Sequence, residues 1–171
     1  MGVVTTKSAA ITNRDATPRV LNNARVEGNV LKSAAAVVAI ASGDSATSKY
    51  LLFSLPSNAV VRSLKVSSPD IGTTTVGDFG LYNTTDAGGA VVDVDFFKAS
   101  VSLKDGAIAK SEIANGNVIT LARMEKAIWE LLAIADTTIL VDPNKMYDVA
   151  LTLTGDADAA GTIFVECEYV I

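Results

Sequence analysis

The sequence contains no histidine among its 171 residues. Histidine is the commonest general acid–base residue and the commonest ligand of transition metals in proteins. Its absence excludes histidine-based catalytic triads and most zinc or copper sites. A glycine-rich phosphate-binding loop with its Lys and Ser or Thr is missing as well. We therefore expect no enzymatic activity, no bound metal and no other cofactor.

Cysteine is almost as scarce, because Cys167 is the only one, so no disulfide can form within the chain. Cys167 lies in an apolar–polar alternation over residues 163–171, on the face opposite Glu166 and Glu168. Free cysteine is among the most buried residue types, and redox chemistry here would need partners that the sequence lacks. We predict a buried, unreactive thiol.

Long apolar runs are also missing. The longest covers residues 34–41, far short of the roughly 20 residues that a membrane helix needs. The N-terminus lacks the basic-then-apolar order of a signal peptide. Hydrophobic residues nevertheless make up 49% of the chain and charged residues only 19%, which predicts a folded protein. We expect no association with a membrane.

The few charges are distributed unevenly. Residues 1–32 carry a net charge of +3, and the remainder carries −8, which together give the overall −5. Phosphate backbones are bound by clustered Lys and Arg, so an acidic body argues against nucleic acid as its partner. The basic segment has no dense basic cluster and no interleaved aromatic residues. We expect it to be solvated or to contact a protein partner.

From residue 30 onward, short apolar and β-branched segments alternate with turn residues at a spacing typical of antiparallel sandwiches. The pattern predicts strands over residues 30–41, 50–55, 59–67, 78–83, 90–99, 147–154 and 161–171, with a brief one over 119–121. Residues 103–117 have turn signals at both ends and fit no single period. Residues 124–135 repeat apolar side chains at helical spacing, which predicts one helix.

These elements predict one domain over residues 30–171, an all-β antiparallel β-sandwich of jelly-roll-like topology with one short helix. Its core should come from the apolar positions of the periodic segments. The predicted core residues are Val38, Ile40, Leu52, Leu64, Val66, Phe79, Leu81, Val92, Phe96, Ile128, Leu151, Leu153 and Phe164.

Residues 1–29 show no sustained period of 2 or 3.6, and Pro18 and the pair Asn22-Asn23 discourage regular structure. We expect an extended N-terminal arm that contributes little to the core. Its basic and apolar side chains should contact a neighbouring subunit. The predicted contact residues are Val3, Val4, Ile11, Arg14, Arg19, Val20, Leu21 and Arg25.

Two pairs of carboxylates invite a calcium interpretation. Asp93 and Asp95 share one strand face, and Asp156 and Asp158 share one loop. Calcium takes oxygen ligands that cluster in this way. Neither pair has the glycine spacing of a calcium-binding loop, so we interpret them as a solvated strand face and a polar loop.

Several turn-and-strand pieces resemble, in their order along residues 30–171, the small capsid decoration (cement) proteins of tailed bacteriophages. The pieces are Pro56-Ser57-Asn58, Gly80-Leu81-Tyr82, residues 88–93, Phe96-Phe97, residues 129–132, residues 147–154, residues 159–162 and Tyr169-Val170. The resemblance implies a non-enzymatic virion protein on the outer surface of a phage head. Its partners would be the major capsid protein, whose subunits it clamps, and further copies of itself as a dimer or trimer. It would be made in the host cytoplasm.

The alternative is a tail- or fibre-associated β-sandwich that binds host carbohydrate. Such a protein would need exposed aromatic side chains that converge with Asp and Asn on one loop surface. The candidates are Tyr82, Asn83, Asp86 and Phe97.

Overall fold

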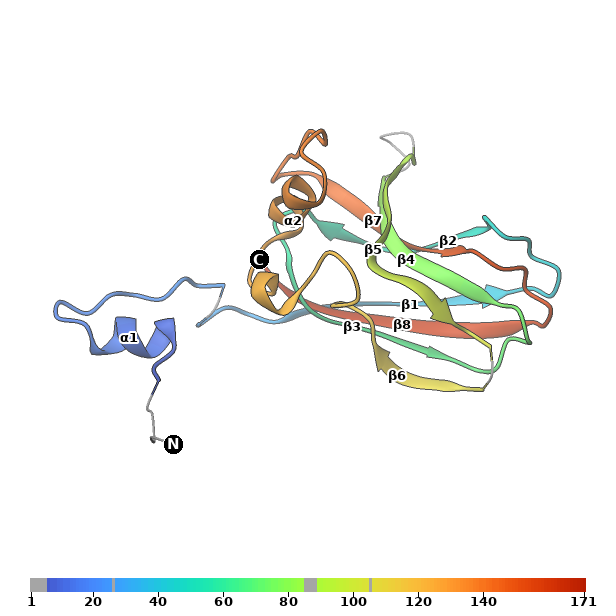
Figure 1. Cartoon of the computed structure of the whole chain (residues 1–171), viewed down its shortest axis with the longest axis horizontal. Helices are drawn as coiled ribbons and strands as arrows, with labels where there is room; N and C mark the ends of the chain where they lie inside the picture. Colours follow the sequence, from blue (N-terminus) through green and yellow to red (C-terminus); the bar gives the residue numbers. More distant parts are fainter. Residues whose placement is uncertain (1–5, 26, 85–88, 105) are drawn as a thin grey trace, which may run out of the picture.

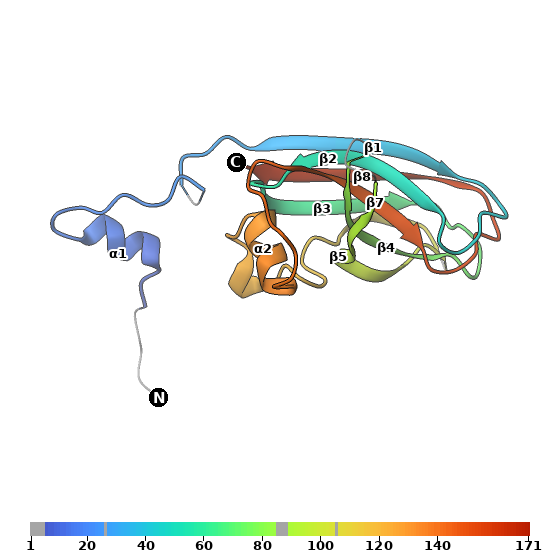
Figure 2. The same ribbon diagram turned by 90° about the horizontal axis from the view of Figure 1, so that it is seen from above.

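The computed structural model describes residues 6–25, 27–84, 89–104 and 106–171. Two four-stranded antiparallel sheets form a sandwich, and the residues before β1 extend from one end of it as an arm (Figures 1 and 2). The strands are β1 (Lys32–Ile40), β2 (Lys49–Pro56), β3 (Val60–Ser68), β4 (Val76–Asn83), β5 (Val91–Ser102), β6 (Ile108–Glu112), β7 (Met146–Leu153) and β8 (Gly161–Val170). The helices are α1 (Ala9–Asp15), α2 (Ile128–Ala135) and the 3-10 turn η2 (Leu121–Arg123).

The strands pair in a nested order. β1 pairs with β8, β2 with β7, β3 with β6 and β4 with β5, all antiparallel. The chain is therefore one long hairpin that turns back between β4 and β5. Alternate pairs belong to opposite sheets, which gives the orders β1-β8-β3-β6 and β2-β7-β4-β5. This is a jelly-roll topology, and it confirms the predicted fold class.

The core lies between the two sheets and follows the alternation of each strand. Most of the predicted core residues are buried, and these are Ile40, Leu64, Val66, Phe79, Leu81, Phe96, Ile128, Leu151 and Leu153. Val38, Leu52 and Val92 are half-buried and pack against this core. The Cys167 side chain is buried as predicted, and burial raises the pKa of its thiol to about 12.

Phe164 is the one predicted core residue that the structure places elsewhere. In β8 the buried side chains are Ile163, Val165 and Cys167, so Phe164 lies on the outer face of the sheet, where it is half-buried. Residues one position apart on a strand point to opposite faces. The prediction for Phe164 was therefore wrong.

The helix α2 begins at Ile128, four residues later than predicted. The Ile128 N–H donates to the Ala59 carbonyl (3.0 Å), and the Trp129 N–H donates to the Ser57 carbonyl (2.9 Å). The Glu130 side chain accepts from the Ala127 N–H (2.8 Å), so the third helical residue satisfies the donor at the cap. The turn between β2 and β3 thus fixes where the helix starts.

Three short elements also differ from the prediction. The ambiguous residues 103–117 contain β6, an edge strand whose side chains are exposed except for a half-buried Ile108. The brief strand predicted over residues 119–121 is wrong, because η2 begins at Leu121. The arm, predicted to lack regular structure, contains the helix α1.

The loops at the end of the sandwich opposite the arm are joined by Asp158. Its carboxylate accepts from the Thr73 N–H (2.9 Å) and from the Thr73 hydroxyl (2.7 Å). A Cβ on Gly72, which has a φ of +83°, would lie 1.9 Å from Asp158 Oδ1. Glycine is thus needed at position 72 both for its backbone conformation and for its small size. The hydrogen bonds from Thr73 lower the pKa of Asp158 to about 2.

In the sheet formed by β2, β7, β4 and β5, the strand β5 approaches β4 very closely at Gly80. The register between the two strands shifts several times, and a Cβ on Gly80 would lie 2.2 Å from the carbonyl oxygens of Asp93 and Val94. This packing half-buries Asp93 next to Asp95, whose N–H donates to Asp93 Oδ1 (3.3 Å). Burial, the largest cause, and the hydrogen bond between the two carboxyl groups together raise the pKa of Asp93 to about 6, while the hydrogen bond from the Asp95 N–H acts in the opposite direction.

Candidate interaction surface on the N-terminal arm

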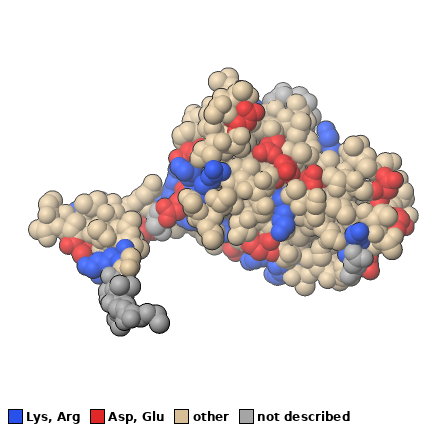
Figure 3. All heavy atoms as spheres, viewed as in Figure 1, with Lys and Arg blue, Asp and Glu red and all other residues tan. Residues whose placement is uncertain are grey.

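Within the described ranges, no three His, Cys, Asp or Glu residues are close enough together to hold a metal ion. Among the same residues, no helix combines the length and the hydropathy that a membrane crossing requires. The arm is the segment in which the predicted contact residues lie, and it projects from the sandwich as a separate lobe (Figure 3).

The arm begins with a capped helix that turns back on itself. Ser8 is the N-cap of α1, and its hydroxyl accepts from the Ile11 N–H (3.3 Å), as expected for a serine before a helix. After the helix, the Val20 N–H donates to the Asn13 carbonyl (3.1 Å), which returns the chain alongside α1. None of the helical residues is buried, so packing against the sandwich does not hold α1 in place.

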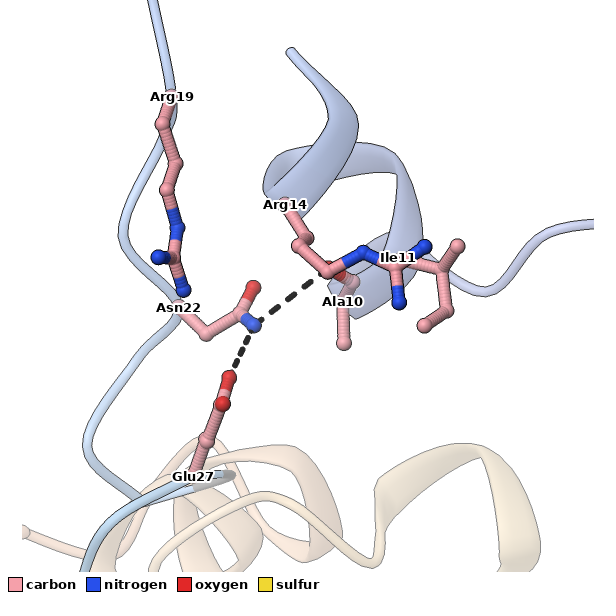
Figure 4. Close-up of a pocket in the computed structure, with 6 residues that line it drawn as sticks. All are labelled: Ala10, Ile11, Arg14, Arg19, Asn22 and Glu27. Carbon is pink, nitrogen blue, oxygen red and sulfur yellow. Dashed lines mark hydrogen bonds between the residues drawn. The ribbon is translucent and has the colours of Figure 1, made fainter.

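Two asparagine side chains close this hairpin. Asn13 Nδ2 donates to Asn22 Oδ1 (2.9 Å), and Asn22 Nδ2 donates in turn to the Glu27 carboxylate and, more weakly, to the Ala10 carbonyl (3.5 Å). Between the helix and the returning chain lies a hollow of about 310 Å³ (Figure 4). Its lining residues are Ala10, Ile11, Arg14, Arg19, Asn22 and Glu27.

The charges on the arm are only partly neutralised within it. Asp15 accepts from Arg14 Nε (2.8 Å) and from Lys7 Nζ (2.9 Å), and these two cations lower the pKa of Asp15. Arg19 forms no ion pair with any residue that the structure describes. The exposed surface of the arm is therefore basic both at Arg19 and around Asp15, where two cations share one carboxylate.

The arm is attached to the sandwich at its base. Arg25 Nη1 contacts Glu130 Oε2 of α2 (2.9 Å), and Arg62 of β3 donates to the Arg25 carbonyl. Asn29 donates to the carbonyl of the C-terminal residue Ile171. Both side chains of the Arg25–Glu130 pair are about three-quarters buried, with 28% and 27% exposed. The base is thus better shielded from solvent than the rest of the arm.

The structure places the predicted contact residues in three settings. Ile11, Arg14 and Arg19 line the hollow. Val20 and Leu21 extend into solvent with 49% and 83% of their surfaces exposed. Arg25 binds Glu130 of its own chain, whereas the prediction had paired it with a neighbouring subunit. Val3 and Val4 lie outside the described residues.

Sequence reasoning missed the residues that shape the arm, namely Asn13, Asn22 and Glu130. For α1, Ser8 followed by Ala-Ala-Ile was a start signal that could have been recognised. The pair Asn13–Asn22 spans nine residues and has no recognisable local signal. Glu130 lies three residues after Ala127, which is a local capping pattern, but its pairing with Arg25 joins residues distant in the sequence.

The residues proposed for carbohydrate binding do not form an exposed aromatic surface. Tyr82 and Phe97 are buried, with 2% and 0% of their surfaces exposed. Asn83 is half-buried and accepts a hydrogen bond from Lys145. Asp86 lies outside the described residues. Tyr82 and Phe97 therefore do not supply the exposed aromatic side chains that the carbohydrate-binding alternative would need.

No protein-family model matches the chain, and no curated protein sequence matches it. Its fold, however, is similar to that of chains in solved phage capsids. One belongs to the cyanophage Pam1 capsid asymmetric unit, with a TM-score of 0.57, 15% identity and a match that covers 97% of each chain. Another belongs to the capsid of Ralstonia phage GP4, with a TM-score of 0.51, 17% identity and coverage of 81% of this chain and 84% of that one.

At such identities the similarity establishes the fold alone. Only 3% of this chain lies outside the match, which is less than the share that residues 1–29 contribute. The match therefore includes part of the arm as well as the sandwich. A chain of similar fold, matched over nearly the whole length of this one, thus occurs in a solved phage capsid.

Proposed function

We propose that the protein is a non-enzymatic structural component of a phage virion, which binds the outer surface of the head and stabilises the shell by clamping major capsid subunits. The observation that carries the proposal is the near full-length match to a chain of the Pam1 capsid asymmetric unit. The absence of histidine and of a metal-ligand cluster among the described residues is in keeping with a structural role.

The arm supplies the contact to the shell in this proposal. Val20 and Leu21 are exposed apolar side chains beside Arg19, and a protein surface could cover all three together. Exposed ion pairs contribute only about 0–1 kcal/mol each and are screened by salt. The larger part of the binding free energy should therefore come from burial of the apolar side chains and from main-chain hydrogen bonds.

Weak contacts per copy suffice for this function. A protein that binds the assembled shell better than free subunits adds its binding free energy to the stability of the shell. Many copies act on one head, so their modest contributions combine. The proposed partners are the major capsid protein and further copies of this chain, as a dimer or trimer, on a virion assembled in the host cytoplasm. Neither nucleic acid nor a membrane is a partner.

The test is to mix purified protein with heads that lack it and to measure co-sedimentation. Leu21→Asp should weaken binding, because it places a charge where an apolar contact forms. Leu140→Asp is the matched control, since Leu140 is equally accessible, at 92% exposed, but lies on the loop before β7. Binding of wild type and of the control, with loss for Leu21→Asp, supports the proposal. No co-sedimentation of wild type, or equal loss for both variants, contradicts the proposed head contact through the arm.

A second measurement addresses the carbohydrate alternative. Wild-type protein is applied to an array of host surface glycans under the same salt conditions. Binding to glycans together with failure to bind heads would favour the alternative, through residues other than the buried Tyr82 and Phe97.

A further inference from the structure

We infer that the free edge of β1 is a docking site for β1 of a second copy of this chain, the two strands pairing antiparallel about a two-fold axis to give one continuous eight-stranded sheet. The inference concerns association of the free protein, so it does not depend on whether the protein binds a phage head. It rests on a comparison of the four sheet edges of the sandwich.

Three of the four edges carry features that prevent further pairing. The edge of β5 is covered, because the Gly116 N–H donates to the Phe97 carbonyl (3.0 Å) and the Val118 N–H to the Phe96 carbonyl (3.2 Å). The edge of β6 is five residues long and largely polar. The edge of β2 begins at a lysine, ends at a proline and has a register shift within it. Short, charged, bulged or covered edges are how proteins avoid unwanted strand addition.

The fourth edge, that of β1, is longer than that of β6, unbulged and uncovered, and it shares with the edge of β2 only a lysine at its start. Its nine residues pair with β8 in unbroken register, and it contains no proline. Lys32 at its start is its only charged residue. In the part of the chain that the structure describes, main-chain hydrogen bonds join β1 to no element other than β8. Figure 2 shows β1 along the margin of the sandwich, with no element beyond it. An edge of this kind is a template for another strand.

The outer face of β1 also carries unshielded apolar surface. Val37 is 67% exposed and pairs in register with Phe164 of β8, which is half-buried on the same face. Ala35 and Ala39, on either side of Val37, are exposed as well. A second β1 that pairs with this edge would extend the apolar surface on the outer face and shield Val37 from solvent without burying any charge.

The second copy is the occupant that this edge fits best, because β1 is complementary to itself. A two-fold axis at Ala36, the middle residue of β1, sets Ala35 of one copy opposite Val37 of the other. It also sets Lys32 of one copy opposite Ile40 of the other. Next to Ile40 lies the Asp44 carboxylate, which accepts from the Ala41 N–H (2.8 Å). Each end of the paired strands would therefore join a lysine to an aspartate.

The test measures self-association in buffer, without heads, by sedimentation equilibrium. Wild type should form a dimer. Val37→Lys should raise the Kd of dimerisation by at least about tenfold, which corresponds to a loss of about 1.4 kcal/mol in the free energy of association. Val91→Lys is the matched control, since Val91 is also an exposed valine, at 52%, but lies on β5. An exposed lysine on an edge strand is tolerated in a folded sandwich, and circular dichroism melting checks that both variants fold.

A cross-linking variant tests the register without weakening the interface. In the variant Ala35→Cys/Val37→Cys, the cysteine at position 35 of one copy lies opposite the cysteine at position 37 of the other. Residues directly opposite each other in an antiparallel pair have Cα atoms about 4.5–5.5 Å apart, which is within disulfide range. Mild oxidation should give a covalent dimer, whereas wild type should give none because Cys167 is buried. A wild-type Kd above about 1 mM, a trimer, or equal effects of Val37→Lys and Val91→Lys would overturn the inference. So would a dimer that the two new cysteines do not cross-link.

Discussion

Asp93 carries a carboxyl group whose ionisation the fold disfavours. Close packing of β5 on Gly80 half-buries its carboxyl group beside Asp95, and burial raises its pKa to about 6 from an ordinary value near 3.8. The folded protein therefore holds this proton more tightly than the unfolded chain does. Its contribution to stability is fully present below pH 4 and is lost as the pH rises through 6.

We expect Asp93→Asn to remove this dependence on pH. The amide cannot ionise, and its oxygen can still accept from the Asp95 N–H, so the variant should melt at a higher temperature than wild type at pH 7.5. At pH 4 the two should melt at similar temperatures, because Asp93 is then protonated in the folded protein. Glu125→Gln, a change at an exposed site, serves as the control. If Asp93→Asn melted above wild type by the same amount at both pH values, the raised pKa of Asp93 would be contradicted.

Asp158 has the opposite behaviour. The hydrogen bonds from Thr73 lower its pKa to about 2, so its folded-state pKa is below the unfolded value. The stability that it contributes is present above about pH 4 and is lost as the pH falls through 2. We expect Asp158→Asn to lower the urea midpoint at pH 7 and to match wild type near pH 2. A deficit that persists unchanged at pH 2 would show that the loops depend on something other than the charge.

On β8 the polar side chains identify the outer face, yet only one of the two residues assigned there was placed correctly. Cys167 was placed correctly, because Glu166 and Glu168 identify the outer face of β8. The same alternation puts Phe164 on the face of Glu166, so its outward position could have been deduced from the sequence. Its hydrophobicity misled the prediction, since side chains on the outer face can also be large and apolar.

Among the elements, those with strong periodicity and clear turn residues were predicted well. The strands other than β6 were predicted close to their observed bounds. β6 was not, because an edge strand with exposed polar side chains has no alternation to detect. α1 was missed because seven residues give too short a period, and α2 was predicted too long because its start depends on the distant carbonyls of Ser57 and Ala59.

Glu130 joins two elements, and its removal should affect both. It accepts from the Ala127 N–H at the start of α2 and pairs with Arg25 at the base of the arm. We expect Glu130→Ala to lower the free energy of unfolding by about 1 kcal/mol, the usual effect of losing a helix cap. It should also speed tryptic cleavage after Arg25, because that side chain loses its partner. Glu125→Ala is the control, and an equal effect of the two substitutions would contradict this role.

For the whole molecule, the arm and the sandwich should be separable. The described residues of α1 are not buried, and the arm is held mainly by contacts at its base. We expect a chain truncated to start at Asn29 to melt within a few degrees of the full chain, because its core is intact. The same truncated protein should fail to bind heads, or should leave them fragile to heat. Decoration as tight as that by the full chain would refute a role for the arm.

The candidate site was predicted less completely than the fold. The lack of a sustained period and the basic charge predicted residues 1–29 as a separate segment, and in the structure Val20 and Leu21 are exposed. The pairing of Asn13 with Asn22 and of Arg25 with Glu130 could not be deduced, since each depends on where the fold brings distant segments together. The free edge of β1 was equally hidden, because the strand order decides which strand lies at a margin.

β1 is the first strand of the sandwich along the chain, and β8, with which it pairs, is the last. Lys32 pairs with Tyr169 and Ile40 with Gly161, so β1 cannot complete this pairing until residues 161–170 have left the ribosome. Closing so long a loop slows folding, and a strand that is still unpaired can aggregate. The sandwich can therefore complete its folding only after residues 161–170 have been synthesised. A nascent chain that stalls before residue 161 should be a substrate for chaperones, with β1 as the segment they cover.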